Sequence, residues 1–162
     1  MGSPDSYLGA QTYKLSLLDG CWAWAMSSVK YVKNAIKTIE TLLKEDGNGL
    51  HLKTTAHIPF PTSYRPELDF SPELSGHPHT RYLPLISILD WTIELGCIDI
   101  HLETSLLSQY LASPNESHLK AVYHISAYLK THNKTSVAFD PKPVDWDERA
   151  FRHTKLLDWK DF

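Results

Sequence analysis

The fold is decided by the stretch YLGAQTYKLSLLDGCWAWAMSSVKYVKNAIKTIETLLK, residues 7–44. Strand-forming residues stand on both sides of Leu18-Asp19-Gly20, and this pattern predicts a β-hairpin over residues 7–26. From Val29 to Leu43 apolar residues recur every three or four positions, which is the spacing of one helical face. The sequence therefore predicts a hairpin that leads directly into an amphipathic helix.

Residues 50–80 have a different character, because prolines recur through them. Prolines at this density forbid a long helix and disfavour a central strand. We expect an ordered or semi-ordered arm that runs over the surface, of a length that suggests contact with another molecule. The prolines in question are Pro59, Pro61, Pro66, Pro72 and Pro78.

Three helices are predicted in the second half of the chain. The first covers about residues 82–95, with Pro84 in its first turn and Gly96 as its stop. Asp99 is suited to cap the second, and the third follows the break at Pro114. The predicted inward stripes are Leu85, Ile86, Leu89 and Ile93; Leu102, Leu106, Tyr110 and Leu111; and Leu119, Val122, Ile125 and Leu129.

The predicted fold class is α+β, in which an N-terminal hairpin precedes a mainly helical bundle. A short strand is expected at residues 136–140, followed by an irregular polar tail in which Trp146, Phe151 and Trp159 are able to dock. The predicted segments are residues 1–49 (hairpin and helix), 50–80 (arm), 81–132 (three helices) and 133–162 (strand and tail).

Composition limits the classes of function. The chain has 162 residues and a net charge of −3, which argues against an electrostatic grip on nucleic acid by the whole protein. Its two cysteines, Cys21 and Cys97, form neither a disulfide framework nor a zinc pattern, so an intracellular setting is expected. No signal peptide is recognised, and no apolar run approaches the ~18 residues of a membrane span.

Motifs that carry chemistry are missing from the sequence. The nine histidines form no H-E-x-x-H pattern, and no G-x-S-x-G elbow or glycine-rich phosphate loop is present. We expect surface or half-buried histidines, and neither a metal nor a cofactor. Five aspartates lie in the tail, which lacks the rigid elements that a metal site needs: Asp140, Asp145, Asp147, Asp158 and Asp161.

Two features favour contact with nucleic acid. Lys30, Lys33 and Lys37 lie off the apolar face of the first helix, and the neighbouring hairpin carries Trp22 and Trp24. Lysines beside exposed aromatic rings suit a surface that follows a nucleic-acid backbone. The alternative is that the lysines only confer solubility while the tryptophans pack in the core.

Three stretches, taken in order, resemble the reverse transcriptase of copia-type retrotransposons. The resemblance covers nearly all of the chain with compatible spacing. In addition, Tyr64-Arg65-Pro66-Glu67 resembles a proline-rich arm in one branch of these elements. The three matching stretches are Tyr7-Leu8-Gly9-Ala10; Tyr82-Leu83-Pro84-Leu85-Ile86-Ser87-Ile88-Leu89-Asp90-Trp91 with Ile98-Asp99-Ile100; and Leu107-Ser108 with Pro114, His118 and Ala127-Tyr128-Leu129-Lys130.

The resemblance implies a position between two active sites. In the family the polymerase aspartates precede this region and the ribonuclease H carboxylates follow it, so the primer-grip hairpin, thumb and connection would remain. Ser87 and Trp91 would then face the duplex, with serine where glycine is usual. Cys97 at a common arginine position and the acidic Asp90 would weaken duplex contact, as in a decayed copy.

The leading hypothesis is therefore a non-catalytic fragment of such a polyprotein that holds template–primer duplex. Its partners would be an RNA–DNA or DNA duplex and the remaining polymerase and ribonuclease H domains. Core packing remains an alternative for Trp91. The competing hypotheses for the whole chain are a stand-alone or domesticated helical module that binds protein, and a segment that folds poorly outside its polyprotein.

Overall fold

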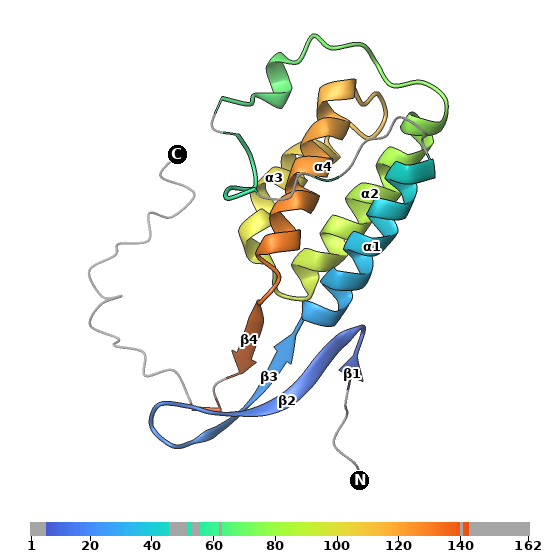
Figure 1. The fold of residues 1–162 in the computed structure, drawn as a ribbon. Helices are drawn as coiled ribbons and strands as arrows, with labels where there is room; N and C mark the ends of the chain where they lie inside the picture. The colour runs from blue at the N-terminus through green and yellow to red at the C-terminus, as the bar shows by residue number, and fades with distance from the viewer. Residues whose placement is uncertain (1–5, 46–51, 53–55, 62, 140, 143–162) are drawn as a thin grey trace, which may run out of the picture.

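The structure, a computed structural model, describes residues 6–45, 52, 56–61, 63–139 and 141–142 (Figure 1). Within these ranges a four-stranded antiparallel sheet packs against the end of a helical bundle. The predicted α+β class, with strands at the N-terminus and helices after them, is confirmed.

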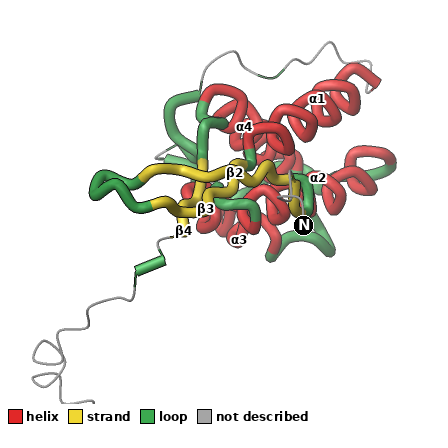
Figure 2. Tube along the Cα trace, turned by 90° about the horizontal axis from the view of Figure 1, so that it is seen from below, coloured by secondary structure: helices red, strands yellow, loops and turns green. Residues whose placement is uncertain are grey.

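The sheet contains the predicted hairpin and one strand from the other end of the chain. The strand order is β1-β2-β3-β4, and every neighbouring pair is antiparallel. The hairpin loop is closed by the Leu17 N–H, which donates to the Cys21 carbonyl at 2.8 Å. Figure 2 shows the hairpin crossing the end of the bundle and projecting beyond it. The strands are β1 (Ser6–Tyr7), β2 (Ala10–Ser16), β3 (Trp22–Ser27) and β4 (Ser136–Phe139).

The structure confirms the apolar face that the spacing predicts for helix α1 (Val29–Glu45). Its inward positions are buried, whereas Val29 in the first turn is only partly covered. The Ser27 hydroxyl accepts from the Val29 N–H at 3.4 Å, so the end of β3 also supports the start of the helix. The buried members are Val32, Ala35, Ile36, Ile39 and Leu43.

Helix α2 (His77–Glu94) begins earlier than the predicted start near Tyr82. Gly76, with a φ of 62°, turns the chain into the helix, and Pro78 occupies the first turn, where a missing N–H costs nothing. Pro84 therefore lies inside the helix rather than in its first turn. Of the predicted inward residues Ile93 is only partly buried, and the buried set is Tyr82, Leu85, Ile86, Leu89 and Thr92.

The predicted stripe of the next helix is only partly confirmed, because Leu106, Tyr110 and Leu111 are half-buried and other residues form the buried face. A 3-10 turn, η2 (Ile98–Ile100), precedes a short helix, α3 (His101–Ser108), and together they bury Ile100, Thr104 and Leu107. Leu102 is exposed instead. The expected cap by Asp99 is also absent, because its carboxylate accepts from the Tyr128 hydroxyl at 2.7 Å. The tighter 3-10 turn changes the phase of the following residues, which a uniform helical period misses.

Helix α4 (Glu116–Thr131) follows the break at Pro114, as predicted. Its predicted stripe is buried except for Leu119, which is half-buried. Neighbouring small residues are buried too, because α4 contacts α1, α2 and α3. The added buried residues are Ala121, Ser126 and Ala127.

The described part of the proline-rich arm packs along one side on its own bundle. It contains a 3-10 turn, η1 (Pro66–Leu68), and its last residues already belong to α2. Leu52, Ala56 and Leu74 of the arm are buried. The arm thus completes the core.

The first three predicted segments share one hydrophobic core. Buried residues from α1, the arm and the later helices form one cluster, and β4 joins the sheet of the hairpin. The predicted roles of Trp146, Phe151, Trp159 and the tail aspartates lie outside the described residues. In the part of the chain that is described, none of the helices combines the length and apolar character needed to cross a bilayer.

Candidate nucleic-acid interface

The hairpin presents both predicted tryptophans on one face of the sheet, since side chains along a strand alternate between faces. Trp22 and Trp24 are 66% and 42% exposed. Lys14, opposite Trp24, places its Nζ 5.5 Å from the centre of the indole ring. On the other side Phe139 of β4 is the partner of Trp24 and is also exposed. The face therefore combines three aromatic rings with a positive charge.

The sequence of β3 explains why these rings stay outside the core. Ala23 and Ala25 alternate with the tryptophans and are buried on the opposite face, where Leu15 and Tyr13 stand across from them in the ladder. The alternative that the tryptophans pack in the core does not hold for Trp22, whose ring is mostly exposed.

The lysines of α1 form a separate stripe. Lys30, Lys33 and Lys37 are all exposed. Lys33 and Lys37 precede Glu40 by seven and three residues, so they share its side of the helix. Glu40 forms an ion pair with Lys130 of α4 at 2.7 Å. The lysine stripe therefore lies on the solvent-exposed flank of α1 that is nearer to α4.

Ser87 and Trp91 lie on the outer side of α2. Ser87 is exposed and donates its hydroxyl to the Leu83 carbonyl at 3.0 Å. Trp91 is 38% exposed, and its Nε1–H donates to the carbonyl of Leu8 in the β1–β2 turn at 3.4 Å. Trp91 is thus neither a core residue nor a free surface residue, because it fastens the hairpin to α2.

The charges near Trp91 oppose contact with phosphate. Burial raises the pKa of Asp90, the neighbouring Glu94 raises it further, and His101 acts in the opposite direction. Two acids on this stretch of α2 repel a polyanion unless they are neutralised. The structure therefore offers the hairpin face as a better nucleic-acid surface than α2.

The predicted residues do not form one continuous surface. Arg81 of α2 donates to the Leu42 carbonyl at 2.8 Å and pairs with Glu45 at 3.3 Å. Helix α2 thus flanks α1 at Leu42 and Glu45, whereas α4 flanks it at Glu40. The lysine stripe and the α2 pair therefore lie toward different flanks of α1.

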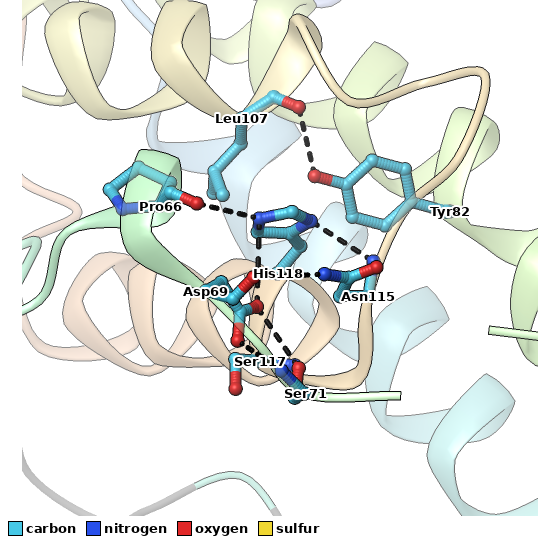
Figure 3. Close-up of polar contacts among 8 residues, drawn as sticks. All are labelled: Pro66, Asp69, Ser71, Tyr82, Leu107, Asn115, Ser117 and His118. Carbon is cyan, nitrogen blue, oxygen red and sulfur yellow. Dashed lines mark hydrogen bonds and ion pairs between the residues drawn. The ribbon is translucent and has the colours of Figure 1, made fainter. Parts of the chain in front are cut away.

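A fully buried polar network around His118 was not predicted, because the histidines were expected to be at the surface or half-buried (Figure 3). His118 is 1% exposed. Its Nδ1 accepts from the Asn115 N–H at 3.0 Å, so the proton is on Nε2, which donates to the Pro66 carbonyl at 3.3 Å. Asp69 Oδ2 lies 3.6 Å from the same Nε2. The imidazole thereby joins the start of α4 to the arm.

This network is not arranged for nucleophilic catalysis. In such a site a serine hydroxyl faces one imidazole nitrogen and a carboxylate orients the other. Here the Ser71 hydroxyl donates to Asp69 at 3.0 Å, and both nitrogens of His118 face backbone groups or Asp69. A sequence signal for this network does exist. Pro114-Asn115 breaks the chain before α4, and a histidine follows in the first turn of that helix.

Asp69 makes the network sensitive to acid. Burial of its carboxyl opposes ionisation, but hydrogen bonds from the Ser71 N–H and hydroxyl, together with His118, outweigh this and lower the pKa of Asp69. A carboxyl whose pKa is lowered by folding stabilises the protein above its unfolded value, near 3.9. That contribution is lost as pH falls toward the folded value.

We expect the melting temperatures of the wild type and of Asp69→Asn to differ clearly at pH 6. They should converge as the pH falls through the folded pKa, which lies below the unfolded value of about 3.9, because only the wild type has this stabilisation to lose. Thermal melts followed by circular dichroism measure the gap. Glu67→Gln, which removes an exposed carboxylate, should run parallel to the wild type, and a pH-independent gap for Asp69→Asn would contradict the assignment.

Metal-binding arrangements are absent from the described part of the chain, where no three His, Cys, Asp or Glu residues come together. His79 and His124 each contact a single backbone carbonyl, at Ala112 and Ile58. These histidines therefore connect segments of the fold.

Comparisons with protein-family models, with curated proteins and with solved structures return no match to this chain. The hairpin face and its chemistry therefore carry the functional proposal.

Proposed function

We propose that this chain is a non-catalytic segment of a copia-type reverse transcriptase that holds the template–primer duplex. The observation that carries the proposal is the exposed pair Trp22 and Trp24, with Lys14 over the second ring. Flat rings beside a cation suit contact with sugars and phosphates of a nucleic-acid backbone. The hairpin would correspond to the primer grip, and α2 to α4 to the thumb and connection.

The partners in this proposal are an RNA–DNA or DNA duplex and the remaining polymerase and ribonuclease H domains. Binding by the isolated chain would be weak, because the net charge is −3. We place the parent protein inside the cell, where the exposed and unpaired Cys21 would stay reduced.

Fluorescence anisotropy with a labelled RNA–DNA hybrid tests the proposal. We expect the dissociation constant to rise steeply between about 50 and about 200 mM salt, because binding releases counterions from phosphates. Trp24→Ala should weaken binding about fivefold or more, since truncating a central aromatic side chain of an interface typically costs more than about 1 kcal/mol. Phe70→Ala removes an exposed ring at the other end of the molecule and should leave binding unchanged.

A hybrid that fails to bind even at low salt would contradict the proposal. It would favour the second candidate, a domesticated helical module that binds protein. One observation supports that candidate independently: the arm exposes two apolar side chains, Leu68 and Phe70, on a backbone held by hydrogen bonds.

A further inference from the structure

Two apolar side chains of the arm point into solvent. Leu68 is 63% exposed and Phe70 is 95% exposed. A single exposed leucine is ordinary, but an almost fully exposed phenylalanine beside it forms an apolar projection that the fold does not use. Leu68 and Phe70 are called the arm knob below.

The backbone that carries the arm knob is fixed on both sides of Phe70. The Asp69 carboxylate accepts from the Ser71 N–H at 2.8 Å, and the Ser71 hydroxyl accepts from the Ser117 N–H at 3.1 Å. Asn115 Nδ2 donates to the Asp69 carbonyl at 3.4 Å. A knob on a preorganised backbone loses little conformational entropy when it docks, which is a property of binding anchors.

The arm knob and the aromatic hairpin face lie at opposite ends of the bundle (Figure 1). The first residue of α4 is held by the arm, because the Glu116 N–H donates to the Pro72 carbonyl at 3.0 Å. The other end of α4 leads into β4 of the sheet. A 16-residue helix spans about 24 Å, so the knob does not reach its own hairpin.

The two surfaces are complementary in charge. Four acids and two bases surround the arm knob, which leaves a net charge of −2. The acids are Glu67, Asp69, Glu73 and Glu116, and the bases are Arg65 and Lys120. The hairpin face carries the positive charge of Lys14 beside Trp24, whereas the ion pair of Lys142 with Asp19 near the turn is neutral. An acidic apolar knob thus matches a basic aromatic face.

We propose that the arm knob of one copy docks on the aromatic hairpin face of a second copy, formed by Trp22, Trp24 and Phe139. Phe70 packs against these rings while Leu68 covers their edge, and the acidic surroundings approach Lys14. The contact is head-to-tail, because the two surfaces differ and each copy offers both.

The size of these surfaces sets the strength of the association. A buried aromatic side chain covers about 150–250 Å², so a contact built on four rings and one leucine falls near or below the ~1,200 Å² of stable complexes. The association is therefore weak and concentration-dependent. The proposal does not depend on nucleic-acid binding, since Phe70 belongs to the knob alone.

Sedimentation velocity on the purified full chain, from micromolar to near-millimolar concentration, tests the contact. We expect the weight-average sedimentation coefficient of the wild type to rise with concentration. Phe70→Ala and Trp24→Ala should each raise the dissociation constant about tenfold or more, as the loss of a central aromatic anchor does. Leu83→Ala, which trims an exposed leucine on α2 outside both surfaces, should behave as the wild type.

The decisive sample is an equimolar mixture of Phe70→Ala and Trp24→Ala. The first variant keeps a functional hairpin face and the second keeps a functional knob, so the mixture should form a one-to-one dimer that does not extend. If Trp24→Ala melts at a lower temperature than the wild type, Trp22→Ala takes its place.

Two results would overturn the proposal. One is a wild-type chain that stays monomeric at every concentration, and the other is undiminished self-association of Phe70→Ala. Failure of the mixture to associate would likewise exclude a head-to-tail contact. Phe70→Ala should bind the RNA–DNA hybrid as the wild type does. The self-association result can therefore be judged separately from the duplex-holding function.

Discussion

Gly96→Ala is expected to lower the free energy of unfolding by about 2–4 kcal/mol. Gly96 ends α2 with a φ of 110°, and a Cβ at this position would lie 2.7 Å from Cγ2 of Val137 in β4. The added methyl group therefore meets both an unfavourable backbone conformation and a neighbour from the other end of the chain. Urea denaturation followed by tryptophan fluorescence measures the loss.

Matched variants separate the two causes. Gly20→Ala, at a φ of 81° with no atom within 4 Å of the added Cβ, reports backbone strain without a clash. It should cost clearly less than Gly96→Ala. Val137→Ala in the Gly96→Ala background removes the colliding methyl groups and should recover part of the stability. Equal losses for the two glycines would refute the close approach of β4 to the end of α2.

His118→Ala is expected to destabilise the protein by about 3 kcal/mol. Its removal leaves the Asn115 N–H and the Pro66 carbonyl without the partner that the imidazole supplies, and it opens a cavity beneath the ring of Tyr110, which stacks on His118 at 4.0 Å. We also expect the arm to open locally, because the imidazole holds it to α4. Hydrogen exchange would show faster exchange at Ser71 and Ser117.

His124→Ala is the matched control for this prediction. His124 lies on the same helix and also contacts an arm carbonyl, that of Ile58 at 3.0 Å, but this bond is at the surface. Its loss should cost less than about 1 kcal/mol. Similar effects of the two substitutions would mean that burial of His118 does not make its hydrogen bonds more important.

The functional proposal depends most on the hairpin. Its tryptophans were predicted as interface residues, and the structure places them on an exposed face with Lys14 nearby. The predicted lysines of α1 lie on the exposed flank of that helix nearer to α4. The sequence could not show this, because the direction of a polar helix face depends on which helices pack beside it.

Local structure was largely determined by the sequence itself. The spacing of Val32, Ile36, Ile39 and Leu43 predicts the buried face of α1, and the alternation of tryptophan and alanine in β3 predicts a strand. Gly96 was predicted as a helix stop, and its N–H bonds to the Ile93 carbonyl as in a Schellman turn. These features depend on neighbours within a few residues, so the local pattern contains the necessary information.

Only the tertiary structure decided how these elements combine. It paired β4 with the hairpin across more than a hundred residues, laid the proline-rich arm on its own core and buried His118 between the arm and α4. It also left Phe70 exposed on a fixed backbone. Each of these outcomes depends on long-range packing and on the pairing of buried polar groups, and no local periodicity encodes which distant segment supplies the partner.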